Sequence, residues 1–503
     1  MTPLLRVFAR YRLNALLTLD VAAAQRATLM KLVGRARNTT FGRDHDFPGV
    51  AGVADFQRRV PLRVFEDFWS TYWARAFPNL VDVSWPGRIP FFALTSGTSS
   101  GRSKYIPVSR EMLRSNRKAA TDLYAFHLRA SPESRVLAGK SLMLGGSSRL
   151  EQEAPGVFSG DLSGIMATSV PWYARSRYFP PRELAQLEDW EEKMAHVAAR
   201  SRHETIRAIA GTTSWLLLFL DQVLRDAHGD TLSDVYPDLD LLVHGGVSFE
   251  PYRARFEALC AGSRTDVREV YPASEGFVAI ADGRPEDGLR LSLDHGIFFE
   301  FVPISDLNRA TPRRHWIATV EEGVEYAIAV TTCAGLWSYL IGDTVRFVDR
   351  AKARIVVTGR TAQMLSAFGE HLIVSELDRA ISGACQATGC TMLDYAVGAV
   401  LPREGSPRGN HVLVVEFAGH TPDSDRFTTL VDQMLQDEND DYRAHRSGDF
   451  GVGPPTLVVG PPGIFAAWMK SRGKLGGQNK VPRIITDAAL LADLWAFAEG
   501  FRD

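Results

Sequence analysis

The sequence predicts an α/β protein with a large N-terminal multi-sheet α/β domain and a smaller α+β C-terminal domain. The chain has 503 residues, which is more than a single hydrophobic core usually supports. Strand-like apolar runs recur between residues 136 and 358, as an α/β core requires. Near Gly359 the pattern changes to a compact alternation of helices and strands. We therefore expect residues 1–359 and 364–503 to form two domains joined by residues 360–363.

The expected elements follow one another in a definite order. Helical patterns dominate the first ninety residues, and a strand is expected from Phe91 into a polar loop. More strand follows at residues 105–107, and Ser109 is the N-cap of a helix that runs to about Leu128. Strands and loops are expected at 136–180, a strongly helical region at 181–228, and strands with loops up to 358. In the last domain we expect helices at 374–381, 425–435 and 488–497 and a strand at 411–417.

The composition agrees with a soluble cytoplasmic enzyme but does not identify one. The formal net charge of -2 gives no electrostatic argument for a nucleic-acid partner. The four cysteines form no C-x-x-C pair or metal-ligand cluster, so reduced thiols are expected. The longest apolar run, residues 215–220, is too short to cross a bilayer, and the first residues suit an amphipathic helix better than a signal peptide. No membrane partner is expected, and we expect a monomer.

The segment from Thr95 to Lys104 has the composition of a polyphosphate-binding loop. An apolar strand leads into hydroxyl residues and glycines, which supply donors and allow the backbone to approach an anion closely. Lys104 adds a full charge. The residues that we expect to contact the phosphates of a nucleotide are Thr95, Ser96, Gly97, Thr98, Ser99, Ser100, Gly101 and Lys104. A plain surface loop rich in serine and glycine is the alternative.

Two other motifs compete for this loop. The Walker A pattern has four residues between its glycines and a lysine directly after the second one, whereas Gly97 and Gly101 enclose three, so this motif is excluded. Residues 97–101 also fit the G-x-S-x-G string of hydrolases. That motif turns from a strand directly into a helix, whereas here more strand follows. A hydrolase therefore stays the weaker alternative.

The whole of residues 95–104 resembles the phosphate loop of the auxin-responsive acyl acid amido synthetases, a branch of the firefly-luciferase-type adenylate-forming superfamily. Residues 271–276 resemble that family's aromatic-x-x-Ser/Thr-Glu motif, apart from the proline at 272. The resemblance implies that the ring of Tyr271 stacks on adenine, that Ser274 lies beside the nucleotide, and that Glu275 helps to hold Mg²⁺. Residues 339–343 resemble the Tyr-x-x-Gly-Asp motif, which implies that Asp343 accepts hydrogen bonds from the ribose hydroxyls.

Two further segments extend the resemblance. The buried strand before Gly245, Gly246 and Val247 is similar to the strand and loop that border adenine in the superfamily. Residues 473–483 resemble the late segment that carries a lysine into the active site, and the spacing around it selects Lys480. We therefore expect Lys480, Lys104 and Glu275 to be the catalytic residues, with ATP and Mg²⁺ as cofactors. The resemblance also implies a mobile C-terminal domain that turns about a hinge at Arg360, Thr361, Ala362 and Gln363.

The acyl pocket is less well marked. Residues 161–173 look similar to the family's pocket lining, and the candidates are Leu162, Ser163, Met166 and Tyr173. The implied function is ATP-dependent activation of a carboxylic acid as an acyl adenylate, followed by transfer to an amine, an amino acid in the family. An acid:thiol ligase and a noncatalytic binder of nucleotide or acyl acid are the alternatives. No residue is assigned as the base that deprotonates the amine, although His127, His203, His244 and His371 are candidates.

Overall fold

The computed structural model describes most of the chain. The described residues are 2–95, 104–145, 148–170, 172–187, 190–246, 249, 252–307, 309–361, 365, 372–400, 409–439, 442–443, 446, 452–475 and 480–500. By its internal contacts the chain divides into two compact units: unit 1 is Met1–Val247 with Glu257–Val356, and unit 2 is Ser248–Phe256 with Val357–Asp503. The predicted hinge thus begins four residues after the last residue of unit 1.

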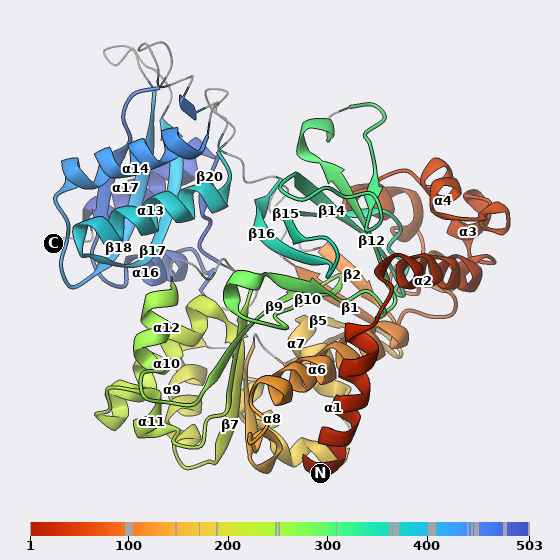
Figure 1. The fold of residues 1–503 in the computed structure, drawn as a ribbon, viewed down its shortest axis with the longest axis horizontal. Coiled ribbons are helices and arrows are strands. Elements are labelled where there is room, and N and C mark those ends of the chain that lie inside the picture. Colours follow the sequence, from red (N-terminus) through yellow and green to blue (C-terminus); the bar gives the residue numbers. More distant parts are fainter. Residues whose placement is uncertain are drawn as a thin grey trace. The chain divides into compact units, whose positions relative to one another are not determined.

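The α-helices and β-strands follow in chain order (Figure 1). The helices are α1 (Thr2–Leu17), α2 (Val21–Ala36), α3 (Thr40–Asp44), α4 (Val53–Arg59), α5 (Phe65–Phe68), α6 (Arg110–Ala130), α7 (Leu162–Thr168), α8 (Arg182–Ala185), α9 (Trp190–Ser201), α10 (Thr213–Ala227), α11 (Leu232–Val235), α12 (Arg253–Leu259), α13 (Val374–Thr388), α14 (Ser424–Glu438), α16 (Ile464–Ser471) and α17 (Ala488–Gly500). The strands are β1 (Phe91–Thr95), β2 (Lys104–Val108), β3 (Lys140–Leu144), β4 (Glu151–Ala154), β5 (Val157–Gly160), β6 (Tyr178–Phe179), β7 (Ile206–Thr212), β8 (Leu241–Gly245), β9 (Asp266–Ala273), β10 (Gly276–Ile280), β11 (Leu289–Leu291), β12 (Ile297–Pro303), β13 (His315–Trp316), β14 (Glu325–Thr332), β15 (Tyr339–Asp349), β16 (Arg354–Arg360), β17 (Thr391–Val400), β18 (Asn410–Ala418), β19 (Thr456–Gly460) and β20 (Ile484–Ile485).

Unit 1 is built on two sheets. A twelve-stranded sheet has the order β13-β12-β14-β15-β16-β11-β10-β9-β8-β7-β3-β6, and a four-stranded sheet has the order β2-β1-β5-β4. Strands β3, β7, β8 and β9 pair in parallel, whereas the pairs β9 with β10, β12 with β14 and β14 with β15 are antiparallel. The parallel strands are joined by helical crossovers, as βαβ units require. The sequence prediction of a multi-sheet α/β domain is confirmed.

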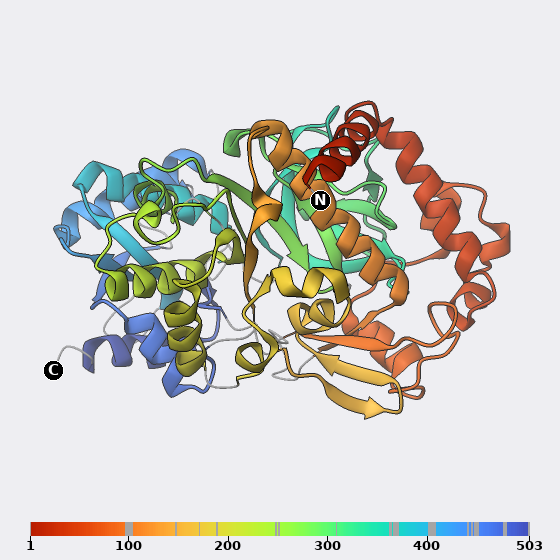
Figure 2. The same ribbon diagram turned by 90° about the horizontal axis from the view of Figure 1, so that it is seen from below.

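Helices cover these sheets because each has one apolar face. Helix α1 packs along α6 through Ala9, Leu13 and Leu16, and Figure 2 shows the two helices side by side. Helix α6 begins where the sequence predicted, since the hydroxyl of Ser109 accepts a hydrogen bond from the amide of Met112. Helix α2 lies on β12, where the fully buried Gln25 bonds the backbone of the strand.

Unit 2 is one sheet between two pairs of helices. The strands have the order β19-β18-β17-β20, and alternate residues of each strand point to opposite faces. Tyr395 and Val397 of β17 pack with α13 and α14, whereas Ala396 packs with α16 and α17. The predicted helices at 374–381, 425–435 and 488–497 and the strand at 411–417 are confirmed as parts of α13, α14, α17 and β18.

Two sequence predictions of local structure were wrong. The region 181–228 was expected to be strongly helical, and α8, α9 and α10 lie in it, but it also contains strand β7 between α9 and α10. The apolar stretch after residue 157 was expected as strand and loop, but α7 occupies Leu162–Thr168. Short apolar runs do not separate a buried strand from a buried helix, and pairing with β3 and β8 made β7 a strand.

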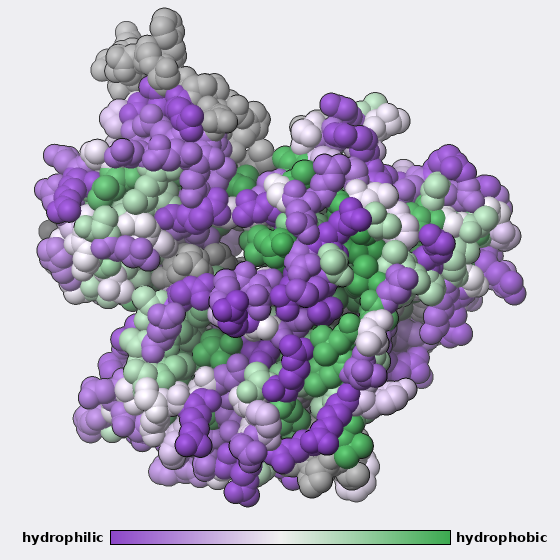
Figure 3. Space-filling view, in the orientation of Figure 1, coloured by the Kyte–Doolittle hydropathy of each residue, from purple (hydrophilic) through white to green (hydrophobic). Residues whose placement is uncertain are grey.

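The face of the molecule seen in Figure 3 is largely hydrophilic, with apolar residues in scattered patches. In the described part of the chain, no helix is both long enough and apolar enough to span a bilayer.

Candidate active site

The predicted phosphate loop is held by the antiparallel hairpin of β1 and β2. Thr95 is the last residue of β1 and pairs with Lys104, the first residue of β2. This confirms the predicted strand on both sides of the loop. Residues 96–103, which include the predicted Ser96, Gly97, Thr98, Ser99, Ser100 and Gly101, lie outside the described residues. The Nζ atom of Lys104 is 3.5 Å from a carboxylate oxygen of Glu66 and 5.6 Å from the ring centre of Phe65.

The predicted glycine pair follows the buried strand β8. A Cβ atom on Gly245 would lie 2.2 Å from the carbonyl oxygen of Val270 in the neighbouring strand β9, so no larger residue fits. Gly246 has a φ of +86°, which side-chain-bearing residues rarely adopt. Both glycines therefore have a local structural reason, and they bring bare backbone to the end of the parallel strands. Val247 lies outside the described residues.

The second motif forms a tight hairpin between β9 and β10. Ala273 pairs with Gly276, so Ser274 and Glu275 are the two residues of the turn. Pro272 leaves the strand intact, because β9 runs to Ala273. The side chain of Glu275 is 8 % exposed, and that of Ser274 is half-buried. The structure therefore places a carboxylate at a rigid turn, with little access to bulk water.

The adenine candidate Tyr271 and the ribose candidate Asp343 are in contact, although they lie on different strands of the large sheet. The hydroxyl of Tyr271 on β9 donates a hydrogen bond to a carboxylate oxygen of Asp343 on β15, with 2.5 Å between the oxygens. Strands β16, β11 and β10 lie between these two in the sheet order, so the sheet must curve to bring them together. The ladder of β14 and β15 is irregular between Leu340 and Thr344, and Gly342 there has a φ of +93°. This irregularity directs Asp343 away from the regular pleat.

A buried polar network that the sequence did not indicate supports the start of the third motif. Arg314 donates to a carboxylate oxygen of Glu300 at 2.7 Å and to the hydroxyl of Ser338 at 2.6 Å. The hydroxyl of Ser338, the residue directly before Tyr339, also donates to a carboxylate oxygen of Glu300. The second terminal nitrogen of Arg314, Nη1, donates to the carbonyl of Val60 at 2.6 Å. Residues 60, 300, 314 and 338 are far apart in sequence, so no local pattern could have linked them.

The predicted acyl-pocket residues lie on α7 and beside it. Leu162 and Met166 are partly buried against the main core of unit 1. The amide nitrogen of Asn116 on α6 is 3.7 Å from the sulfur of Met166, and the amide oxygen of Asn116 is buried without a partner among the described residues. Ser163 lies against Gly145, where an added Cβ atom would come within 2.8 Å of it. Tyr173 is in a 3₁₀ turn, and its side chain is not among those described.

A buried lysine that the sequence analysis missed lies next to this helix. The ammonium of Lys193 on α9 donates to the carbonyls of Gly145 and Ala185, each at 3.2 Å. Burial lowers the pKa of Lys193, and the nearby charge of Asp161 opposes that shift. Lys193 therefore bonds the same glycine that lies against Ser163 of the predicted acyl-binding segment. A single lysine in an amphipathic helix carries no sequence signal for such a position.

Unit 2 carries the predicted mobile lysine. Lys480 is exposed to solvent, three residues before the buried Arg483. Arg360 is the last residue of β16, and Thr361 follows it. The other hinge candidates, Ala362 and Gln363, lie outside the described residues.

Two of the candidate histidines, His127 and His244, are buried in unit 1. His127 is fully buried, and its two ring nitrogens contact Asp266 at 2.7 Å and Ser134 at 2.8 Å. His244 is 2 % exposed within β8. Both side chains are therefore part of the buried interior of unit 1. His203 follows α9, and His371 lies outside the described residues.

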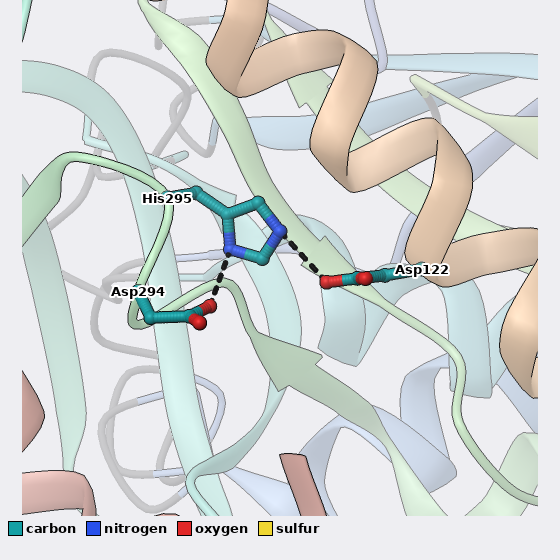
Figure 4. A group of neighbouring side chains, drawn as sticks. All are labelled: Asp122, Asp294 and His295. Carbon is teal, nitrogen blue, oxygen red and sulfur yellow. Dashed lines mark ion pairs between the residues drawn. The ribbon is translucent and has the colours of Figure 1, made fainter. Parts of the chain in front are cut away.

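Among the described residues, one group of acids and histidine is close enough to hold a metal ion: Asp122, Asp294 and His295 (Figure 4). His295 lies between the two carboxylates, 2.9 Å from Asp122 and 3.1 Å from Asp294. Arg12 of α1 bonds both carboxylates, each at 2.7 Å, and Lys118 bonds Asp294 at 2.8 Å. The cationic side chains already neutralise both acids, so this group is an ion-pair network that fastens α1 to α6.

The residues brought together in unit 1 suit a nucleotide chemically. One sheet carries the buried ring of Tyr271, the carboxylate of Asp343, which can accept hydrogen bonds from a ribose, and the backbone of Gly245 and Gly246, which have no side chain of their own. The buried carboxylate of Glu275 is the kind of hard oxygen ligand that Mg²⁺ takes alongside phosphates. The donor set therefore fits ATP with Mg²⁺.

Comparison with known proteins agrees with this geometry. Residues 12–198 match the GH3 family N-terminal domain, residues 291–359 the GH3 family central domain, and residues 375–489 the GH3 family C-terminal domain. The probable indole-3-acetic acid-amido synthetase GH3.1 of Oryza sativa subsp. japonica is 24 % identical over 96 % of this chain and 90 % of its own length.

Solved structures give the same result for the fold. The structure of AtGH3.15 acyl acid amido synthetase in complex with 2,4-DB has a TM-score of 0.81 at 20 % identity and covers 97 % of this chain and 96 % of its own. A 2-hydroxyisobutyryl-CoA ligase in complex with 2-HIB-AMP has a TM-score of 0.63 at 16 % identity, with 95 % of this chain and 92 % of its own covered. With all three domain models of one family matched in order, the chain belongs to the GH3 family.

Proposed function

We propose that this protein is an ATP-dependent acyl acid amido synthetase. It activates a carboxylic acid as an acyl adenylate with release of pyrophosphate, and then transfers the acyl group to an amino acid with release of AMP. The observation that carries the proposal is the hydrogen bond of 2.5 Å from Tyr271 to Asp343, which joins the adenine and ribose candidates in one site. Membership of the GH3 family supports the same reaction.

The nucleotide is assigned to residues of unit 1. The ring of Tyr271 stacks on adenine, Asp343 accepts from the ribose hydroxyls, and Gly245, Gly246, Val247 and Ser274 border the base. The hairpin loop from Thr95 to Lys104 takes the phosphates. Lys104 can leave Glu66 for a phosphate at little cost, because a 3.5 Å ion pair with a half-exposed glutamate contributes at most about 1 kcal/mol.

Glu275 is assigned to Mg²⁺. The metal ion supplies charge neutralisation of the pyrophosphate leaving group when it is bound. What this chain contributes is a carboxylate fixed at the two-residue turn between β9 and β10, so that little reorganisation is needed.

Lys480 is assigned to the adenylation step. Attack of the substrate carboxylate on the α-phosphate builds charge on nonbridging oxygens, and a lysine delivered to them stabilises the transition state selectively. Delivery requires unit 2 to move, with residues 360–363 as the hinge. No protein nucleophile is needed, because the acyl adenylate is itself the activated donor.

The acyl acid is assigned to α7, at Leu162, Ser163 and Met166, together with Tyr173. The names of the relatives suggest aryl and indolic acids as the first substrates to try, since the AtGH3.15 structure holds 2,4-DB and the rice relative is named for indole-3-acetic acid. We also propose that the protein acts as a cytoplasmic monomer. Its four cysteines are free thiols, which suits a reducing compartment.

The proposal is tested by pyrophosphate release across a panel of aryl, indolic and aliphatic acids with ATP and Mg²⁺. Each acid is run with an amino-acid mixture, with coenzyme A, and with neither. We expect AMP and an amide only when amino acids are present. Product only with coenzyme A would assign the chain to the acid:thiol ligases. ATP binding without turnover would favour a noncatalytic binder or a substrate outside the panel.

A further inference from the structure

A short segment from the middle of the chain belongs to the C-terminal unit. Ser248–Phe256 contacts unit 2, although the residues before and after it belong to unit 1. Its described aromatic side chains are all buried: Phe249 is 8 % exposed, Tyr252 3 % and Phe256 1 %. The segment begins two residues after Gly246, so it directly continues the glycine pair that borders the proposed nucleotide site.

One arginine of unit 2 receives this segment. The guanidinium of Arg483 donates to the hydroxyl of Tyr252 at 2.6 Å and to the carbonyl of Tyr395 at 2.8 Å, and it forms an ion pair with Asp394. The hydroxyl of Tyr252 in turn lies 3.4 Å from Asp394. The guanidinium carbon is 4.4 Å from the ring centre of Tyr395 and 5.6 Å from that of Tyr252. Arg483 is thus enclosed by two rings, a carboxylate and a carbonyl, and only 8 % of it is exposed.

The partners of Arg483 are themselves rigid. Tyr395 is fully buried in β17, and its hydroxyl donates to the buried Asp378 at 2.6 Å. The amide of Val397 in β17 donates to the carbonyl of Arg483 at 2.8 Å, where β20 begins to pair with β17. The backbone and the side chain of Arg483 are therefore both fixed to the same strand.

Lys480 is connected to this fixed point by a very short link. Two residues lie between Lys480 and Arg483, so the Cα atoms of the two are at most about 11 Å apart. Pro482 restricts the backbone of that link further, because its ring fixes φ. The exposed lysine therefore extends from a position that Arg483 sets.

We infer that Arg483 is a positioning residue for Lys480, and that it holds the loop after the glycine pair Gly245 and Gly246 in the same set of contacts through the hydroxyl of Tyr252. This inference rests on the proposed function, in which Lys480 acts in adenylation. One side chain then links the segment that follows the glycine pair with the residue that stabilises the transition state. A purely structural arginine would need the contacts to Asp394 and Tyr395 but not the contact to Tyr252.

Two variants isolate this role. Tyr252→Phe removes only the hydroxyl, and Arg483→Lys keeps the charge beside Asp394 but loses the fork that reaches three partners at once. The matched control is Tyr442→Phe in the same unit. Tyr442 is also fully buried, and its hydroxyl donates to Asp432, which pairs with Arg446. The control therefore breaks the same kind of contact away from Lys480.

The activity readout separates the two half-reactions. We expect Tyr252→Phe to lower kcat for acid-dependent adenylation about tenfold and Arg483→Lys to lower it about a hundredfold, since small misplacement of a catalytic group has effects of this size. The KM for the acyl acid and the rate of amide formation from supplied acyl adenylate should stay within twofold of the wild type, and Tyr442→Phe should match the wild type throughout. Equal losses in both half-reactions, or wild-type adenylation by Tyr252→Phe, would overturn the inference.

A second readout needs no turnover, so it stays decisive if the wild type proves inactive and the proposed function fails. Hydrogen exchange of the full-length protein should rise in peptides that cover 249–256 and 480–485 in Tyr252→Phe, but not in Tyr442→Phe. Unchanged protection in both peptides would show that the hydroxyl does not hold these segments together, whatever the activity.

Discussion

The hydroxyl of Tyr271 lies 2.5 Å from a carboxylate oxygen of Asp343, although the two residues come from strands separated by three others in the sheet. The bond fixes the orientation of the Asp343 carboxylate and of the tyrosine ring at the same time. A change in the position of Tyr271, the adenine candidate, should therefore also change the position of Asp343, the ribose candidate.

Tyr271→Phe should weaken ATP binding while leaving the chemical step nearly unchanged. A hydrogen bond to a charged group contributes about 1.5–3 kcal/mol, so we expect the KM for ATP to rise about tenfold or more with kcat within twofold. Steady-state kinetics with ATP as the varied substrate will measure this. An unchanged KM would mean that the bond does not orient Asp343.

Asp343→Ala and Lys480→Ala should affect different steps. Loss of Asp343 removes the ribose acceptor, so binding of ATP in the first half-reaction and of the acyl adenylate in the second should both weaken. Loss of Lys480 should slow adenylation about a hundredfold, which corresponds to about 3 kcal/mol, and leave amide formation from supplied acyl adenylate nearly intact. The comparison uses pyrophosphate release for the first step and amide yield for the second. Equal impairment of both steps by Lys480→Ala would refute its assignment.

Met166→Ala should change which acids are accepted. Met166 is half-buried on α7 and contacts Asn116, so its truncation opens space in the proposed acyl pocket. We expect kcat/KM to shift towards bulkier acids by about tenfold, with the KM for ATP unchanged, since a methylene or two in an apolar pocket is worth about 1–3 kcal/mol. Thr168→Ala, at the end of the same helix, is the control. An identical preference order in both variants would exclude Met166 from the pocket.

Asp122→Asn should destabilise unit 1. Burial opposes ionisation of Asp122, but the hydrogen bonds from Arg12 and His295 prevail and lower its pKa. Removing the charge leaves Arg12 and His295 short of a partner, so a loss of about 3 kcal/mol is expected at pH 7. Because the folded-state pKa is depressed, the wild type keeps this stability above pH ~4 and loses it as the pH falls further. Urea unfolding at pH 7 and pH 3 should therefore show a smaller difference between variant and wild type in acid.

Glu416 makes the stability of unit 2 depend on pH in the opposite direction. Burial raises the pKa of Glu416 to about 7, despite hydrogen bonds from the amides of Gly463 and Phe465 at the start of α16. The folded state therefore binds more protons than the unfolded state, and stability falls as the pH rises from about 5 to about 8. Glu416→Gln should remove this dependence, which is worth at most about 3 kcal/mol. Thermal unfolding of both proteins at pH 5 and pH 8 will measure it, and parallel pH profiles would contradict the assignment.

The sequence by itself determined the parts of the site that are encoded locally. The strand on either side of the loop at Thr95 and Lys104, the N-cap of α6 at Ser109 and the glycine pair after β8 all follow from side-chain size, hydroxyl acceptors and backbone freedom. These depend on neighbours within a few residues, so a pattern can reveal them. Strand β7 was missed because its pairing with β3 and β8, and not its composition, made it a strand.

Only the tertiary structure decided which residues meet. The contacts of Tyr271 with Asp343, of Arg314 with Glu300 and Ser338, and of Tyr252 with Arg483 join residues that lie 72, 14, 24 and 231 positions apart. Such contacts depend on how the large sheet curves and on which unit a loop joins, and both are set by the packing of the whole chain. The chemistry of each residue can thus be read from the sequence, but its partners are fixed by packing.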